Sequence, residues 1–395
     1  MPIFRIVALC FLCALTAPSS AQVADSTLLS KMDSVDISLL TCGPGKKIFT
    51  LYGHTAIRIN DRANNEDWVA NWGIFSFNQP FFIPRFVFGL TDYHIGVSTT
   101  EAFRELYVED ENRWIAEQKL NLTPTEKANI LHALAINYQP ENRTYRYNYF
   151  YDDCTTRARD MILNNLDGTV NYPGTTEHNP SCREYIHQWT ANHRWARFGN
   201  DLLLGLKADR ETSLAVRQFL PDNLRHDFSI AIVRADDGTS RKLVAEELRT
   251  DPAVKNTEVA PSPFTTPTVC FLVFTIVILL VTIVEYVKSR NFWMVDAFLL
   301  LADGLAGLIL FVMIFSQHPT VSLNLQILLL NPLSLVLLHP VVKRARKGRS
   351  HWFWKVFAGC IVLFLIGNLF QNYAEGMNIL ALCLLIRCGT HLFQK

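Results

Sequence analysis

The sequence predicts an exported α+β domain followed by a bundle of five transmembrane helices. Its 395 residues are enough for two domain-sized units, and charge is divided unevenly between them. Most charged side chains lie in the first two thirds, whereas the last third is largely apolar, which is typical of a membrane domain. The formal net charge is only +1, so nothing in the composition indicates a nucleic-acid partner.

Residues 1–21 have the features of a secretory signal peptide. Arg5 supplies the positive start, Ile6 to Leu15 the apolar run, and Ser19-Ser20-Ala21 a small-residue cleavage site. We expect a cleaved signal, with an uncleaved anchor as the alternative. The domain that follows, residues 22–250, is exported in either case.

The nine cysteines do not form a disulfide framework. Six lie in or beside apolar stretches, where cysteine behaves as a small hydrophobe: Cys10, Cys13, Cys270, Cys360, Cys383 and Cys388. Cys42, Cys154 and Cys182 remain for the exported domain. A Cys42–Cys182 bridge beside a free Cys154 would suit an oxidising compartment, and so would three free thiols.

Two early strands carry candidate site residues. Residues 48–60 alternate as a strand, which places His54, Ala56 and Arg58 on one face, because alternate residues of a strand share a face. Residues 68–77 form a second strand that includes Asn71 and is expected to run antiparallel to the first. Residues 75–93 are unusually aromatic, and Pro80, Pro84 and Gly89 argue against one regular element there. That segment either forms an apolar surface that binds a fatty acyl chain or the bilayer, or it belongs to the hydrophobic core of the domain.

The remaining helices and strands of the exported domain are predicted from apolar periodicity and from helix-capping residues. Thr123-Pro124-Thr125-Glu126 is a capping box that opens a helix to about Tyr138. We also expect helices over 100–111, 181–195 and 209–220, and strands over 113–122, 228–234 and 241–248.

Cys154 is predicted to open a helix. It follows a strand of alternating aromatics, Tyr145 to Tyr151, and Asp152 or Asp153 can cap the helix that begins there. The partial positive charge of a helix N-terminus stabilises a thiolate, so a low thiol pKa and a nucleophilic role are expected. The alternative is a buried structural cysteine.

The chain after residue 250 predicts a linker and a membrane domain. Residues 251–267 are rich in proline, and residues 268–395 contain five apolar segments of near-spanning length: 268–287, 293–315, 321–341, 352–370 and 377–393. Basic residues cluster after the first segment and between the third and fourth, whereas loops 317–320 and 371–376 carry none. The basic loops are therefore expected in the cytoplasm, and five spans connect an exported N-terminal domain to a cytoplasmic C-terminus.

A thiol nucleophile needs a base, and the base needs an orienting group. Of the histidines in the exported domain, His54 combines a strand position with a preceding glycine, Gly53, that leaves room nearby and a small neighbour, Ala56, on its face. Asn71, on the following strand, is the candidate orienter. The domain has no H-x-x-x-H, C-x-x-C or G-x-S-x-G spacing, so we expect no metal, no cofactor and no serine nucleophile.

The order histidine, polar residue, then cysteine at a helix start is that of the circularly permuted papain-like (NlpC/LRAT-like) fold, as in lecithin:retinol acyltransferases. The chain more closely resembles the Bacteroidota lipoprotein N-acyltransferases called Lnb, through the blocks LLTCGPG, YGHTAIRI, NWGIFSF, LNLTPTEK, QPENRTYRYNYFYDDCTTRARD and LLLGLKADRET. The family motif is expected to be D-N-C-T-T-R, and this chain has Asp153 at the Asn position. The resemblance implies Cys154 as nucleophile and His54 as base.

The resemblance also implies an activity. Cys154 would take an acyl chain from a phospholipid as a thioester and pass it to the α-amino group of a diacylglyceryl-cysteine lipoprotein. The partners would be the phospholipid, the lipoprotein and the membrane, and the location the bacterial inner membrane with the catalytic domain in the periplasm. Two alternatives remain at this point: an NlpC-type cysteine peptidase or amidase acting on the cell wall, and a non-enzymatic envelope scaffold.

Overall fold

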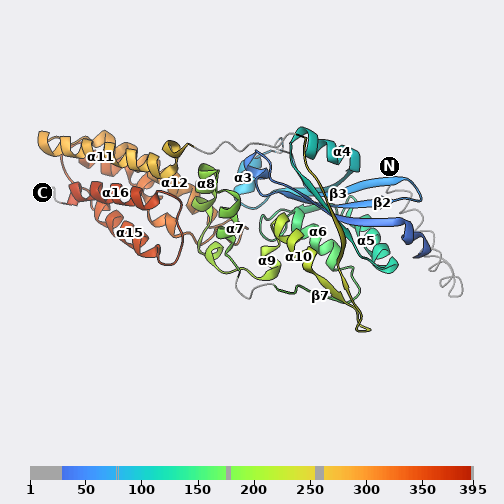
Figure 1. The fold of residues 1–395 in the computed structure, drawn as a ribbon. Coiled ribbons are helices and arrows are strands. Elements are labelled where there is room, and N and C mark those ends of the chain that lie inside the picture. The colour runs from blue at the N-terminus through green and yellow to red at the C-terminus, as the bar shows by residue number, and fades with distance from the viewer. Residues whose placement is uncertain (1–28, 77, 79, 175–178, 254–261, 393–395) are drawn as a thin grey trace. The chain divides into compact units, whose positions relative to one another are not determined.

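The structure, a computed structural model, describes residues 29–76, 78, 80–174, 179–253 and 262–392. The predicted signal peptide and most of the predicted linker lie outside these residues. The described residues form two units (Figure 1). The first holds those of Met1–Arg85, Leu90–Asn179 and Thr212–Glu258, and the second those of Phe86–Gly89, Pro180–Glu211 and Val259–Lys395. The boundaries predicted at residues 250 and 267 stay predictions.

The first unit is built on an antiparallel sheet of seven strands in the order β10-β5-β1-β2-β3-β4-β6. The strands are β1 (Val35–Cys42), β2 (His54–Asp61), β3 (Glu66–Ile74), β4 (Asp92–Thr99), β5 (Ile115–Leu120), β6 (Thr144–Arg146) and β10 (Val244–Thr250). A second, three-stranded sheet joins β7 (Thr169–Asn171), β8 (Ile232–Arg234) and β9 (Ser240–Lys242). The predicted antiparallel pairing of the two early strands is confirmed, with Ala56 opposite Asn71.

The central strands are apolar on both faces, so two cores form. Ile57 and Ile59 join the larger core with residues of α5, α6 and α10. Ala56, on the opposite face, packs in a smaller core with Phe103 and Tyr107. The helical elements of this unit are η1 (Met32–Ser34), η2 (Ile48–Thr50), α3 (Phe82–Val87, whose last two residues belong to the second unit), α4 (Thr100–Arg104), the π-helical η3 (Glu105–Asp110), α5 (Pro124–Asn137), α6 (Cys154–Leu163), α9 (Leu214–Arg217) and α10 (Pro221–Ile230).

Several predicted boundaries need correction. The strand expected over 48–60 begins only at His54, because Gly53 has a left-handed φ of 89° that ends the extended backbone, and residues 48–50 form η2. The aromatic strand is short: β6 ends at Arg146, and the chain then turns, with Asn148 bridged to Asp152. The helix expected over 209–220 is reduced to α9.

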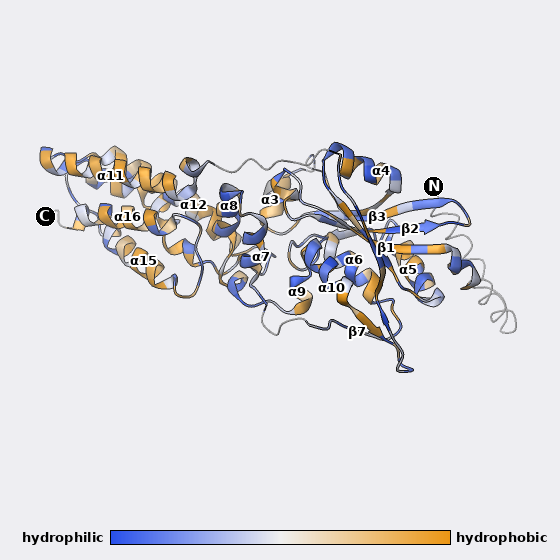
Figure 2. Ribbon diagram, in the orientation of Figure 1, coloured by the Kyte–Doolittle hydropathy of each residue, from blue (hydrophilic) through white to orange (hydrophobic). Residues whose placement is uncertain are grey.

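The second unit is helical. Its elements are α7 (Cys182–Trp189), α8 (Arg194–Leu203), η4 (Leu206–Asp209), η5 (Pro263–Thr265), α11 (Pro267–Lys288), α12 (Trp293–Met313), η6 (Leu325–Leu328), α13 (Leu333–Val336), α14 (Leu338–Ala345), α15 (Phe353–Gly367) and α16 (Met377–Leu392). The helix expected over 181–195 is therefore two helices, α7 and α8. Figure 2 shows long apolar stretches along α11, α15 and α16.

Among the described residues, α11 and α12 are each long and apolar enough to cross a membrane. A third crossing is possible where η6–α13 and α14 form an apolar pair bent by 72°. This broken segment replaces the single helix expected over 321–341. The last two expected spans correspond to the shorter apolar helices α15 and α16, of 15 and 16 residues. By length and composition, two or three segments among the described residues of this unit can therefore span a membrane.

The polar residues in the apolar helices bond mainly to one another. In the membrane unit, Arg387 donates to Asp296 at 2.7 Å and also pairs with Glu285, and His391 lies 3.0 Å from Asp296. Ser334 donates to Asp303 at 2.5 Å. These contacts satisfy charges that would otherwise be costly in an apolar interior, so they act as helix-packing contacts.

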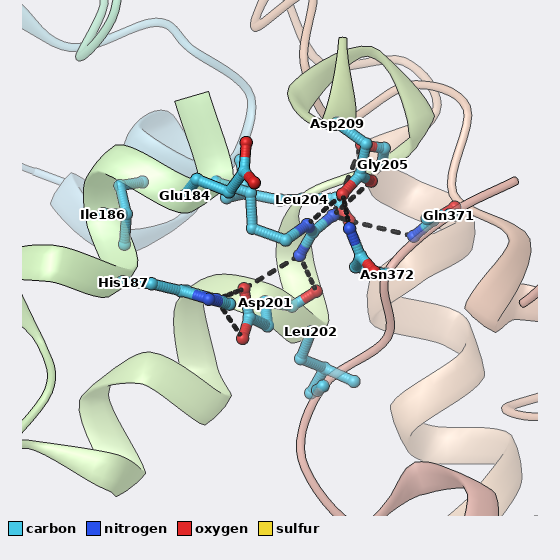
Figure 3. Close-up of polar contacts among 12 residues, drawn as sticks. Glu184, Ile186, His187, Asp201, Leu202, Leu204, Gly205, Asp209, Gln371 and Asn372 are labelled. Carbon is cyan, nitrogen blue, oxygen red and sulfur yellow. Dashed lines mark hydrogen bonds and ion pairs between the residues drawn. The ribbon is translucent and has the colours of Figure 1, made fainter. Parts of the chain in front are cut away.

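Within the second unit, Arg183 ties α7 to α8 and η4. Figure 3 labels its partners Asp201, Leu204 and Asp209. Its guanidinium is buried, donates to Asp201 and Asp209 at 2.9 Å each, and reaches the Leu204 carbonyl at 2.9 Å. His187 also lies 2.8 Å from Asp201. Polar side chains from the loop after α15 complete the network: Gln371 donates to the Leu204 carbonyl and Asn372 to Asp209.

We predict that Arg183→Met destabilises the second unit strongly, by about 3–5 kcal/mol, because it leaves two buried carboxylates without their cation. Arg249→Met is the matched control, since Arg249 pairs with Asp251 on the surface and its loss should cost less than about 1 kcal/mol. Thermal unfolding of the full chain in detergent micelles measures both. Equal losses in the two variants would contradict this account of the network.

Candidate active site

The three predicted site residues meet at one end of the large sheet, where β2 begins, β3 ends and α6 begins. Gly73, near the end of β3, lies at this point of the sheet. A Cβ atom on Gly73 would lie 3.7 Å from Cβ of Cys154 and 3.9 Å from Cε1 of His54. Cys154 and His54 therefore border the same small space, although 100 residues separate them in the sequence.

Two glycines shape this space in different ways. Gly73 has φ 91°, in the left-handed region, and lies where the β3–β4 register shifts between Asn71 and Ile74. A bulge of this kind redirects the backbone, and glycine leaves the volume beside the two side chains open. The room expected beside Gly53 is absent, because a Cβ there would lie 2.8 Å from the Cys42 carbonyl oxygen.

His54 contacts the side chain of Asn71 on the neighbouring strand. Its Nε2 lies 2.6 Å from Oδ1 of Asn71. Asn71 pairs with Ala56 across the ladder, and His54 shares a face with Ala56, so the antiparallel register alone brings the two side chains together. With Asn71 Oδ1 as acceptor, Nε2 carries the ring proton, and Nδ1 is left with a lone pair that can accept one.

Two further side chains, Tyr107 and Arg113, stack in series on the imidazole. The Tyr107 ring lies parallel to the His54 ring with centroids 5.6 Å apart, and the Arg113 guanidinium lies 4.7 Å from the Tyr107 centroid. Arg113 is buried and held by the Gly43 carbonyl at 2.6 Å and by Glu111 at 2.8 Å. Burial lowers the pKa of His54 to about 4; the bond to Asn71 opposes this, and the positive Arg113 adds to it. The imidazole is therefore neutral at neutral pH.

Cys154 is the first residue of α6, as predicted, and its thiol is half-buried. The start of the helix is fixed to β2, because Thr55 Oγ1 donates to Thr155 Oγ1 at 3.2 Å. Thr155 Oγ1 in turn lies 3.8 Å from the sulfur. The expected low thiol pKa is wrong: burial raises the pKa of Cys154, and this outweighs N–H groups of Thr55, Cys154 and Thr155 that hold it down. The resting pair is a neutral thiol beside a neutral imidazole.

Asp153 caps α6. Of the two residues proposed as the helix cap, Asp152 and Asp153, the structure therefore selects Asp153. Its carboxylate accepts from the backbone N–H groups of Thr155 at 2.9 Å and Thr156 at 2.8 Å, and Thr156 Oγ1 accepts from the Asp153 N–H. The neighbouring Asp152 instead pairs with Arg157 at 2.5 Å. Burial raises the pKa of the Asp153 carboxyl well above its usual range, and the negative charge of a Cys154 thiolate raises it further.

Four residues that shape the site were not predicted as site residues: Thr55, Gly73, Tyr107 and Arg113. Tyr107 and Arg113 come from η3 and the turn before β5, so only the fold brings them to His54. Cys42, Cys154 and Cys182 are all free thiols, the second of the two arrangements left open. Among the described residues no group of three or more His, Cys, Asp or Glu side chains could hold a metal ion.

Comparison with known families agrees with this organisation. Residues 24–184 match the family model described as the Lnb N-terminal periplasmic domain. Residues 259–395 match the model described as the Lnb transmembrane domain. No curated protein and no solved structure matches the chain. Because two models of one family match its two parts in the expected order, the chain belongs to the Lnb family, as a periplasmic domain joined to a transmembrane domain.

Proposed function

We propose that the protein is a lipoprotein N-acyltransferase with Cys154 as nucleophile, His54 as general base and Asn71 as the residue that orients His54. The observation that carries the proposal is the 2.6 Å bond between His54 and Asn71, with Cys154 across the space beside Gly73. The family membership supports the acyl-transfer chemistry and a lipoprotein substrate. The fold of the catalytic part is, in this proposal, the permuted papain-like type.

The first step is attack on a phospholipid ester. Nδ1 of His54 takes the thiol proton as the Cys154 sulfur bonds to the ester carbonyl carbon. The carbon–oxygen bond to the glycerol then breaks, and the lysophospholipid alkoxide leaves with the proton held by His54. The acyl chain remains as a thioester on Cys154. A base is required here because the buried thiol has a raised pKa and does not ionise by itself at neutral pH.

Backbone N–H groups near the sulfur are the proposed oxyanion donors. The Asp153 carboxylate already occupies the N–H groups of Thr155 and Thr156. The N–H groups of Thr55 and Cys154 also approach the sulfur, where they counter the burial that raises its pKa. Fixed donors of this kind stabilise charge that develops on the carbonyl oxygen without reorganisation.

The second step transfers the acyl chain to an amine. The α-amino group of a diacylglyceryl-cysteine attacks the thioester carbon, the carbon–sulfur bond breaks, and His54 returns the amine proton to the sulfur. The products are an N-acylated lipoprotein and free Cys154. The amine must be neutral to attack, and an ordinary α-amino pKa near ~8 leaves a usable neutral fraction at neutral pH.

The membrane unit fits a protein whose substrates both lie in a bilayer. Its segment 180–211 is exported by the predicted topology, and it bonds to the loops predicted outside: Gly205 N–H to the Thr320 carbonyl at 2.8 Å, and Arg194 to Glu375 at 2.7 Å. These contacts support the inner-membrane orientation and the five-span arrangement that we propose. A cell-wall peptidase has no need of such a unit, which favours the transferase.

We predict that Cys154→Ala and His54→Ala each leave lipoproteins with a free N-terminus, because the first removes the acyl carrier and the second the base. Mass spectrometry of a lipoprotein N-terminal peptide from cells that depend on the variant measures this. Cys270→Ala and His132→Ala are matched controls at exposed positions and should retain N-acylation. Unchanged N-acylation in Cys154→Ala would overturn the proposal.

A second prediction concerns Asp153, where the family motif is expected to have Asn. Asp153→Asn should keep the fold, because the amide oxygen can accept the same two N–H bonds. It should also shift the pH dependence of Cys154 alkylation to lower pH, since it removes a carboxylate that opposes thiolate formation at any pH where Asp153 is ionised. Peptide-resolved mass spectrometry after alkylation at a series of pH values gives the midpoint.

Asp153→Ala is the comparison variant for this test. It removes the same charge but also the helix cap, so it should lose about 1 kcal/mol of stability in addition. A midpoint in Asp153→Asn that stays in place or moves to higher pH would show that Asp153 does not oppose ionisation of the thiol.

A further inference from the structure

Five aromatic side chains of the first unit form a connected series, called here the aromatic row: Phe49, Phe75, Phe82, Tyr93 and Tyr147. The Phe49 and Phe75 centroids lie 6.2 Å apart, those of Phe75 and Tyr93 4.7 Å, and those of Tyr93 and Tyr147 4.2 Å. Phe82 stacks on Phe75 at 5.6 Å. None of these contacts is needed to place His54 or Asn71.

One end of the aromatic row is open to solvent. Phe49 is 54% exposed, and Ile48 beside it is 63% exposed. Phe81, which precedes Phe82, is 80% exposed and has a left-handed φ of 56°. A bulky side chain in that region is strained, and strained backbone is found preferentially at functional sites. Large apolar side chains are thus exposed to solvent at this end of the row, although such side chains are usually buried.

The other end of the aromatic row lies in the same core as Cys154. Phe75, Tyr147 and Cys154 all pack against the same core that contains Tyr93. Burial raises the pKa of the Tyr93 hydroxyl, and the charge of a Cys154 thiolate raises it further, as expected for neighbouring groups. Phe75 also follows the Gly73 turn by two residues, so the backbone that opens the space beside Cys154 continues directly into the row.

Positively charged side chains lie close to the exposed end of the aromatic row. Lys46 and Lys47 are exposed, and the Lys47 ammonium lies 5.9 Å from the Phe49 centroid. The ammonium of Lys47 lies 3.9 Å from the partly buried Glu111, and an ion pair at this distance with an exposed lysine contributes little. Apolar rings beside two cations match a molecule with a long apolar chain and an anionic phosphate, which is the chemistry of a phospholipid.

We propose that the aromatic row, together with the exposed Phe81 next to Phe82, binds the acyl chain of the phospholipid donor and leads its ester carbonyl to Cys154, with Lys46 and Lys47 near the phosphate. This inference rests on the proposed function and adds to it the surface that holds the donor. It implies a preference for long acyl chains, because a short chain ends before it reaches the exposed rings. The contacts to Phe49 and Phe81 then contribute only to long-chain donors.

The test uses the full chain in detergent micelles and measures acyl-thioester formation on Cys154 by intact mass. The donors are two phosphatidylethanolamines, one with sixteen-carbon and one with four-carbon acyl chains. The double variant Phe49→Ser, Phe81→Ser should lower kcat/KM for the long-chain donor by about tenfold or more, since burial of one or two phenylalanine rings has an effect of about this size. The rate with the short-chain donor should stay within about twofold.

Two controls make the result specific. Leu248→Ser removes an exposed apolar side chain on β10, outside the aromatic row, and should leave the ratio of the two donors unchanged. Phe49→Leu, Phe81→Leu keeps an apolar surface and should retain most of the long-chain preference. Unchanged alkylation of Cys154 in each variant reports that the site is folded.

The two proposals fail in different ways. If the wild-type chain forms no thioester with either donor, the proposed function is wrong. If it forms the thioester but the double variant keeps the wild-type ratio of long-chain to short-chain rates, the donor chain lies elsewhere and the aromatic row is overturned as its binding surface.

Discussion

The bond between His54 and Asn71 is the interaction on which the rest of the site depends. It fixes the imidazole tautomer, and it exists because β2 and β3 pair in a register that sets Ala56 opposite Asn71. The same strands give the site its other parts: Thr55 bonds to the start of α6, and Gly73 opens the space between Cys154 and His54. A one-residue slip in this ladder would turn His54 to the other face and dismantle the site.

Burial sets the protonation chemistry of the pair. The surroundings of His54 and Cys154 disfavour both charged forms, so the pKa of His54 is lowered and that of Cys154 is raised. An ion pair at rest is therefore disfavoured, and in the proposed mechanism the thiol is activated as its proton passes to the imidazole during attack. Such surroundings keep most of the thiol protonated at neutral pH, and in the proposed mechanism it becomes a strong nucleophile once an ester is held beside it.

The membrane unit is organised by polar contacts that satisfy one another. Arg183 holds α7, α8 and η4 together, and Gln326 donates from the membrane part to the Asp201 carbonyl at 2.8 Å. Deeper in the unit, Arg387 and Asp296 pair at 2.7 Å. Further contacts fix segment 180–211 to the loops before η6 and after α15 of the same unit. In the proposed function, placement of the substrates is the contribution of this unit.

Local rules predicted the parts of the site that depend on neighbouring residues. The cap at Asp153, the helix start at Cys154 and the antiparallel strands of His54 and Asn71 follow from turn residues, alternation and strand order. The stack of Tyr107 and Arg113 on His54 could not be predicted, because it joins residues from separate elements.

Two further errors have a physical cause in packing. The helix dipole suggested an acidic thiol, but burial has the larger effect. The third apolar segment was expected as one helix, yet Asn331 and Pro332 interrupt it where the backbone passes close to Gly307 of α12: a Cβ on that glycine would lie 2.6 Å from the Pro332 nitrogen. Neither effect is encoded in the local apolar pattern.

An acyl thioester at Cys154 is the intermediate that the proposed mechanism requires. Intact-mass analysis of the purified full chain, incubated with phospholipid and without an amine acceptor, should show one added acyl chain that maps to Cys154 and is released by neutral hydroxylamine. Addition of a diacylglyceryl-cysteine peptide should discharge it. A chain that carries no acyl group under these conditions, or carries one unchanged in Cys154→Ala, would contradict the account.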